Sequence, residues 1–201
     1  MRRPLLLLAA LALPFATPAA ADLATGVKAP NFSAAGAVAG KPITFTLSKQ
    51  LQKGNLVVAY FFPAAFTGGC NAEAHAFAEA MPDFEKAGAT VVGLTAGNAS
   101  LDKLIKFSSE HCAGKFPVVG ATTQMIADYD VRLKGKDGKP TSITSRTSYV
   151  IAPDGKVLFV HSDMNPADHI SGTLAAVRKY RLRHPTRKAQ AEPEQNRYLH
   201  L

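Results

Sequence analysis

The sequence predicts an α/β fold in which a mixed central sheet carries helices on both faces. Three observations support this prediction. Apolar, strand-like runs alternate with amphipathic helical segments along most of the 201 residues. Near the C-terminal end, an Asp154–Gly155 turn joins two further apolar runs, as in an antiparallel hairpin. Finally, a chain of this length can bury one core without disulfide or metal staples, and its two cysteines cannot form a disulfide-dense scaffold.

Six segments are predicted to be strands. The first has alternating polarity and is typical of an edge strand. The second and third are continuously apolar, as strands buried on both faces are. The fourth is short and extended, and the last two form the hairpin. In chain order these segments are Thr44–Leu47, Leu56–Phe62, Thr90–Leu94, Phe116–Val119, Ser148–Ile151 and Lys156–Val160.

Five segments are predicted to be helices, because their apolar residues recur every three to four positions or because a capping residue precedes them. Pro82 is expected to separate the first two, since proline suits the first turn of a new helix. The polar, glycine-rich segment Arg132–Ser145 is predicted to be a loop. The helices are Cys70–Ala80, Pro82–Ala87, Leu101–His111, Thr123–Tyr129 and Ala167–Tyr180.

Residues 1–21 have the three parts of a cleavable secretory signal. A basic start, Met1–Arg3, precedes the apolar segment Pro4–Ala16 and the small-residue cleavage site Ala19–Ala21. An uncleaved anchor is the alternative, although the apolar segment is short for a span of about 20 residues. No other segment is long and apolar enough to cross a membrane. We therefore expect cleavage after residue 21 and a protein that acts in the bacterial periplasm.

The formal net charge of +8 is concentrated at the two ends of the chain. Two arginines lie in the signal, and residues 178–201 hold seven basic but only two acidic side chains. Residues 22–177 are therefore nearly neutral, and we expect a domain over residues 22–180 and a basic, disordered tail over residues 181–201. Contact of this tail with anionic lipid or a partner is the less favoured alternative. No basic patch interleaved with aromatic residues is visible, which argues against a nucleic-acid partner.

Cys70 is the first candidate for chemistry. It follows a buried strand and the Gly68–Gly69 turn, at the predicted start of a helix. The free N–H groups and the positive end of a helix dipole favour an anion there, and thus the reactive thiolate. The alternative is a small, inert, buried cysteine. Position alone does not decide between these two interpretations.

The residues around Cys70 resemble the active-site motif of the peroxiredoxin family. Pro63–Cys70 matches its pattern P-x-x-x-T-x-x-C, and Lys28–Phe32 is similar to its N-terminal A-P-x-F segment. Arg146–Val157 is similar to its arginine-bearing strand and hairpin. The resemblance covers about residues 26–177. Within this AhpC/TSA-like family, Cys70–Ala74 is most similar to the Q-type, or bacterioferritin-comigratory, subgroup.

The resemblance implies a thioredoxin-like fold and a thiol peroxidase that needs no metal or organic cofactor. Cys70 would be the peroxidatic cysteine, whose thiolate attacks hydrogen peroxide or a small organic hydroperoxide and becomes a sulfenic acid. Arg146 would polarise the peroxide and stabilise the thiolate. Thr67 would hydrogen-bond the peroxide, and Pro63 would limit solvent at the sulfur. Glu73 would orient Arg146, or would be only a carboxylate favoured by the helix dipole.

The sequence departs from the family pattern at two positions. Gly68 stands where a proline or similarly stiff residue often follows the threonine. His75 stands where the Q-type subgroup often has a resolving cysteine. Because some Q-type members carry that cysteine on the next helix, the resemblance implies an intramolecular Cys70–Cys112 disulfide during turnover, with local unwinding to bring the two together. A bystander Cys112 with an external resolving thiol, and a static structural disulfide, are the alternatives.

The implied partners are a peroxide and a thiol reductant, either a periplasmic thioredoxin-like protein or a small thiol. A periplasmic thiol–disulfide exchange protein is the alternative function, although Cys70–Glu73 lacks the second thiol of a Cys-x-x-Cys motif. A non-enzymatic module on the same fold is a third possibility. His75 and His111 match no zinc spacing and are expected to be surface histidines. Arg132 is a less favoured candidate for the cation of the site.

Overall fold

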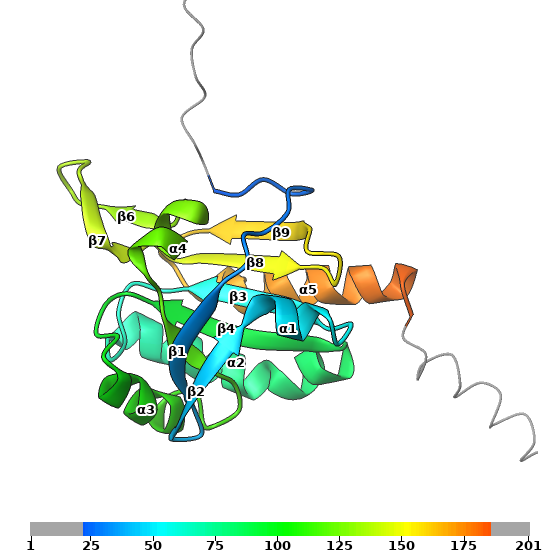
Figure 1. The fold of residues 1–201 in the computed structure, drawn as a ribbon, viewed down its shortest axis with the longest axis horizontal. Helices are drawn as coiled ribbons and strands as arrows, with labels where there is room; N and C mark the ends of the chain where they lie inside the picture. The colour runs from blue at the N-terminus through cyan, green and yellow to red at the C-terminus, as the bar shows by residue number, and fades with distance from the viewer. Residues whose placement is uncertain (1–21, 186–201) are drawn as a thin grey trace, which may run out of the picture.

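A seven-stranded mixed sheet forms the centre of the computed structural model, which describes residues 22–185 (Figure 1). The strand order is β2-β1-β5-β4-β3-β8-β9. The three central strands β5, β4 and β3 are parallel, and all other pairs in the sheet are antiparallel. The strands are β1 (Ser33–Val38), β2 (Lys41–Thr46), β3 (Leu56–Phe61), β4 (Ala89–Thr95), β5 (Val118–Gly120), β8 (Thr147–Ile151) and β9 (Val157–Ser162).

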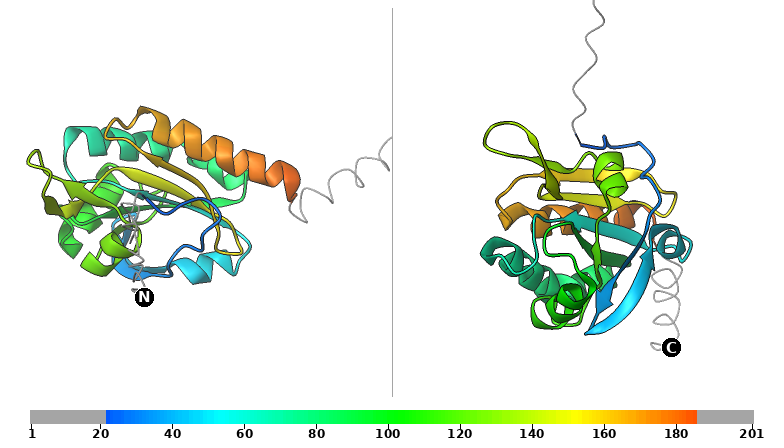
Figure 2. Two further views of the ribbon diagram at one scale, coloured as in Figure 1. Left: turned by 90° about the horizontal axis from the view of Figure 1, so that it is seen from above. Right: turned by 60° about the vertical axis from the view of Figure 1, so that its left-hand side comes forward.

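Helices cover both faces of this sheet, as predicted. Alternate residues of β3 point into two separate hydrophobic cores, with Val58 and Tyr60 in one and Val57 and Phe61 in the other. The first core receives side chains from α2, α3 and α5, and the second from α1 and α4. Figure 2 shows α2 and α5 on one side of the sheet and α1 on the other. The helices are α1 (Leu47–Leu51), α2 (Gly68–Lys86), α3 (Leu101–Glu110), α4 (Thr123–Asp128) and α5 (Ala167–Arg183).

The prediction of two helices separated at Pro82 is wrong, because α2 runs without a break from Gly68 to Lys86. Proline removes one backbone N–H donor from a helix. Here Pro82 lies on the exposed side of α2, while Met81 and Phe84 beside it are buried in the core. The apolar face of the helix therefore continues through the proline and keeps the helix in one piece.

The prediction of a loop over residues 132–145 is also wrong. This segment forms a two-stranded antiparallel ribbon of β6 (Arg132–Lys134) and β7 (Pro140–Thr144), which extends from the domain in Figure 1. A turn closes the ribbon, where Gly138 has a φ of 75° and the Asp137 side chain accepts the Lys139 N–H. Local pairing of polar residues does not produce the apolar pattern on which strand prediction rests.

Two short elements at the start of the domain, strand β1 and helix α1, were not predicted. Strand β1 pairs with both β2 and β5, and its Gly36 allows the backbone of β5 to approach closely. The predicted edge strand Thr44–Leu47 is the end of β2, since Leu47 already begins α1. Small side chains dominate β1, so its apolar pattern is weak.

The last helix extends beyond the predicted domain boundary at residue 180. Helix α5 continues to Arg183, and the Arg181 side chain donates hydrogen bonds to the carbonyl groups of Gly54, Ala87 and Gly88 at 2.9–3.0 Å. Arg181 is thus part of the domain and not of a solvated tail. The rest of the predicted tail, residues 186–201, and the predicted signal, residues 1–21, lie outside the described residues.

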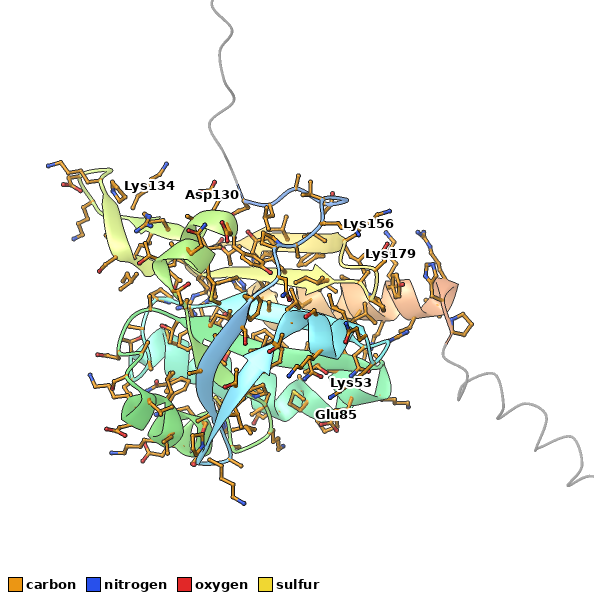
Figure 3. All side chains as sticks on the ribbon, in the orientation of Figure 1. Lys53, Glu85, Asp130, Lys134, Lys156 and Lys179 are labelled. Atoms are coloured by element: carbon orange, nitrogen blue, oxygen red, sulfur yellow. The ribbon has the colours of Figure 1, made fainter. Side chains whose placement is uncertain are left out.

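Basic side chains are spread over the surface of the domain. Lys134, Lys156 and Lys179 project from three different elements, namely the β6–β7 ribbon, the turn before β9 and helix α5 (Figure 3).

Among residues 22–185, no helix combines the length and the hydrophobicity that a membrane span requires.

Candidate active site

Cys70 lies in the first turn of α2, directly after the central strand β3, as the sequence predicted. Its side chain is 2% exposed and belongs to the core between the sheet and α2. The connecting loop contains Phe66, a non-glycine residue with a φ of 63°. A left-handed conformation at such a residue is strained and is maintained only by its surroundings. The Phe66 ring packs edge-on against the rings of Phe107 and His111 in the α3 region, with distances between ring centroids of 5.4 and 5.5 Å.

A second loop supports the loop that leads to Cys70. The Pro63 carbonyl accepts hydrogen bonds from the Gly97 N–H and the Thr95 hydroxyl, both at 3.2 Å. The two backbones approach so closely that a Cβ at Gly97 would collide with the Pro63 carbonyl and Ala64. These contacts hold Pro63 near the start of α2 through its backbone. They are separate from the predicted role of its ring, which is to limit solvent at the sulfur.

Thr67 is the N-cap residue of α2, but its hydroxyl does not cap the helix. The hydroxyl donates instead to the Ala64 carbonyl at 3.0 Å. The first N–H groups of the helix are therefore not occupied by this side chain, and they add to the positive potential near Cys70.

Arg146 connects the sheet to the Cys70 thiol. It precedes β8 in the chain, is 4% exposed, and donates from Nη2 to Cys70 Sγ at 3.5 Å. Its Nη1 donates to Glu73 Oε2, and its Nε donates to the Met164 carbonyl at 2.9 Å. The guanidinium is thus held on three sides, with one nitrogen facing the sulfur.

Glu73 is 1% exposed and lies one turn after Cys70 on α2. Burial raises its pKa from 4.5 to about 8, although the neighbouring Arg146 guanidinium opposes this shift. The contact with Arg146 favours the orienting role over that of a simple first-turn carboxylate. The second carboxyl oxygen, Oε1, has no hydrogen-bond partner among the described residues.

Cys112 lies in the turn that follows α3 and not on the helix itself. It is a free thiol, fully buried in the same core as Cys70, and this burial raises the pKa of its thiol. Tyr60 belongs to the same core as both thiols. Burial is the main reason why the pKa of its hydroxyl is raised, and Cys112, Glu73 and Cys70 add to this shift. That hydroxyl also has no hydrogen-bond partner in the part of the chain that the structure describes.

A buried polar group behind Glu73 was missed by sequence reasoning. His169 of α5 is fully buried, with its Nδ1 4.0 Å from Glu73 Oε1 and 2.8 Å from the Ser148 hydroxyl. Burial is the main reason why the pKa of His169 is lowered from 6.5 to about 4. No motif signals this residue, because its role depends on α5 packing against α2 and β8.

The remaining candidates do not join the site. Arg132 donates to the Thr141 carbonyl within the β6–β7 ribbon. His75 is exposed and pairs with Glu79 at 3.4 Å, whereas His111 is half-buried against aromatic rings and is not a simple surface residue. Between residues 22 and 185, no three His, Cys, Asp or Glu side chains gather as a metal site would require.

Comparison with known proteins places this arrangement in a family context. Residues 25–160 match the model of the AhpC/TSA family. Chloroplastic peroxiredoxin Q from Oryza sativa subsp. japonica is 31% identical over 127 residues, which are 61% of this chain and 54% of the rice protein. Peroxiredoxin Bcp from Xanthomonas campestris pv. campestris is 28% identical over 132 residues, 63% of this chain and 79% of that protein. The match thus spans about half the length of the rice relative.

Solved structures support the same placement of the fold. Peroxidoxin BcpB from Mycobacterium tuberculosis is 30% identical, with a TM-score of 0.65 over 77% of this chain and 96% of that one. Peroxiredoxin Q from Xanthomonas campestris is 26% identical, with a TM-score of 0.62 over 72% of this chain and 89% of that one. The predicted thioredoxin-like fold is therefore confirmed.

Proposed function

The chain belongs to the AhpC/TSA family, and on this premise we propose that it is a peroxiredoxin that reduces hydrogen peroxide and small organic hydroperoxides. The observation that carries the proposal is the Arg146 guanidinium nitrogen at 3.5 Å from Cys70 Sγ. A fixed cation beside a thiol in the first turn of a helix stabilises the thiolate. It also supplies donors for the oxygen atoms of a peroxide bound at the sulfur.

The proposed reaction balances within this site. The Cys70 thiolate attacks one peroxide oxygen, an S–O bond forms and the O–O bond breaks. The sulfur is oxidised by two electrons to sulfenic acid, and the peroxide is reduced. The leaving hydroxide or alkoxide takes up a proton from water and departs as water or an alcohol. Arg146 stabilises the negative charge that moves from sulfur to the leaving oxygen.

Peroxide consumption by matched cysteine variants tests this proposal. Cys70→Ser should abolish peroxide turnover with any thiol reductant and leave the circular dichroism spectrum unchanged. Cys112→Ser serves as the control, because it should retain the first oxidation of Cys70 by one equivalent of peroxide. Full turnover by Cys70→Ser would overturn the assignment of Cys70 and of the peroxidase activity.

We further propose that Cys112 resolves the sulfenic acid by forming an intramolecular disulfide with Cys70. The support is that both thiols lie in one hydrophobic core, which also contains Tyr60. The burial that raises the pKa of Cys112 makes it a poor nucleophile in this conformation. Its turn, and the loop around Phe66 that packs on the same region, would therefore open after oxidation.

Non-reducing mass spectrometry after one equivalent of peroxide tests the resolving role. A Cys70–Cys112 linked peptide, absent before oxidation, supports it. A persistent sulfenic acid with a free Cys112 refutes it and favours an external thiol. A disulfide already present in the untreated protein would instead indicate a static bond.

The remaining proposals concern the compartment and the reductant. The basic start, apolar segment and small-residue site of residues 1–21 support export to the periplasm. In that compartment the reductant is a thioredoxin-like protein or a small thiol. N-terminal sequencing of the protein from the periplasmic fraction tests cleavage after residue 21, and turnover with each class of thiol identifies the reductant.

A further inference from the structure

His169 links three parts of the site that lie on different elements. Its Nδ1 contacts the Ser148 hydroxyl of β8 at 2.8 Å, and its Nε2 contacts the Asp163 carbonyl at 2.9 Å. The ring is fully buried at the start of α5, and the His161 ring packs edge-on against it at 4.6 Å. A buried imidazole is tolerated when both of its nitrogen atoms have hydrogen-bond partners, as they do here.

The partners determine which nitrogen carries the proton. A carbonyl oxygen only accepts hydrogen bonds, so Nε2 must be the protonated nitrogen that donates to Asp163. In a neutral ring Nδ1 is then the acceptor and takes a hydrogen bond from the Ser148 hydroxyl. Burial favours this neutral form and lowers the pKa of His169 to about 4. The charged or titratable groups near the ring are Glu73, His161, Arg146 and Asp163.

The segment held by His169 also holds Arg146. The Asp163 N–H donates to the Arg146 carbonyl at 3.2 Å, and the Met164 carbonyl accepts from Arg146 Nε at 2.9 Å. The Nε bond sets the direction of the guanidinium plane, and with it the placement of Nη2 near Cys70. A shift of the 163–164 backbone would therefore move the cation away from the sulfur.

We propose that neutral His169 is a positioning residue for the peroxide site: its Nε2–H anchors the Asp163–Met164 backbone, which in turn aims the Arg146 guanidinium at Cys70. The inference rests on the proposed function for its catalytic meaning. It predicts that the donor at Nε2 matters, and that the bond at Nδ1 matters little.

Two variants of His169 separate these contacts. By bond count, the amide nitrogen of glutamine reaches the place of Nε2, and that of asparagine the place of Nδ1. His169→Gln should therefore retain a second-order rate constant for Cys70 oxidation within about threefold of wild type, whereas His169→Asn should lose about tenfold or more. Ser148→Ala, which removes only the Nδ1 partner, is the matched control and should stay within about twofold.

The readouts distinguish positioning from general stability. Rates of Cys70 oxidation by peroxide and of its alkylation by iodoacetamide are followed by peptide mass spectrometry, and melting temperatures are measured in parallel. Unchanged rates in a folded His169→Asn protein, or a His169→Gln variant as slow as His169→Asn, would overturn the proposal. If the wild-type protein consumed no peroxide, the proposed function would fail, while the alkylation series would still test how Arg146 is positioned.

A measurement on the wild-type protein covers the case in which His169→Asn does not fold. Imidazole ¹⁵N chemical shifts at neutral pH report which ring nitrogen carries the proton. The proposal requires the Nε2-protonated tautomer at His169. An imidazolium, or the Nδ1-protonated tautomer, would overturn it.

Discussion

Replacing Glu73 with glutamine is expected to change how the free energy of unfolding depends on pH. Burial raises the pKa of Glu73 from 4.5 to about 8 in the folded protein. Below pH 4.5 both the folded and the unfolded chain hold the proton. Above it, only the folded chain retains the proton, so stability falls progressively until the pH passes about 8.

His169 contributes a slope of the opposite sign, because its pKa is lowered from 6.5 to about 4. As the pH falls below 6.5, His169 takes up a proton in the unfolded chain but stays neutral in the folded protein. The free energy of unfolding therefore falls toward pH 4. The two slopes oppose each other below pH 6.5. Between pH 6.5 and 8 the contribution of Glu73 is the larger of the two, and linkage gives it a loss of about 1–2 kcal/mol.

Urea unfolding of the wild-type protein and of Glu73→Gln, at several pH values from 6.5 to 8 and constant ionic strength, measures this loss. The comparison removes the contributions of the titrating groups that do not interact with Glu73. The wild type should lose about 1–2 kcal/mol more than the variant over this range. Glu79→Gln, on the same helix but with a side chain 72% exposed, should behave as the wild type. Parallel pH profiles for the wild type and Glu73→Gln would refute the reasoning.

Three further substitutions test the backbone around the site and the domain boundary. Gly97→Ala should lower the free energy of unfolding by about 2 kcal/mol, because a Cβ there would collide with the Pro63 carbonyl. Urea unfolding measures this loss, and a midpoint equal to that of the wild type would contradict it. Gly68→Pro should raise the melting temperature by about 2 °C, because Gly68 begins α2 with free space around it, and a lower value in calorimetry would count against it. Arg181→Ala should cost about 1–2 kcal/mol through three lost hydrogen bonds, whereas Arg183→Ala, scored in the same urea assay, should cost little; equal effects would refute the anchoring role.

The elements that were predictable share one property, which is a local apolar pattern. Strand β3 is buried along its whole length, and the continuous run Leu56–Phe62 indicates this directly. The polar ribbon β6–β7 and the small-residue strand β1 have no such pattern, since backbone pairing with a neighbour defines them. The break predicted at Pro82 failed for the converse reason, because packing of the surrounding apolar face outweighed a local signal.

The candidate site divides in the same way. Cys70, Thr67 and Pro63 lie within eight residues, so a motif in the sequence indicates them together. Arg146 is 76 residues from Cys70, and only the family resemblance linked the two before their contact was observed. His169 has no motif, and its place behind Glu73 follows only from the packing of α5.

The sequence by itself determined the α/β class, the central buried strands and the place of Cys70 at the start of a helix after a buried strand, because each depends on residues close together in the chain. The tertiary structure alone decided which groups surround the thiol. It brings Arg146, which precedes β8, together with Glu73 of α2 and His169 of α5 in one buried cluster, where desolvation shifts the pKa values of Glu73 and His169 in opposite directions. Desolvation and three-sided hydrogen bonding depend on distances between segments far apart in sequence, and the folded chain alone defines those distances.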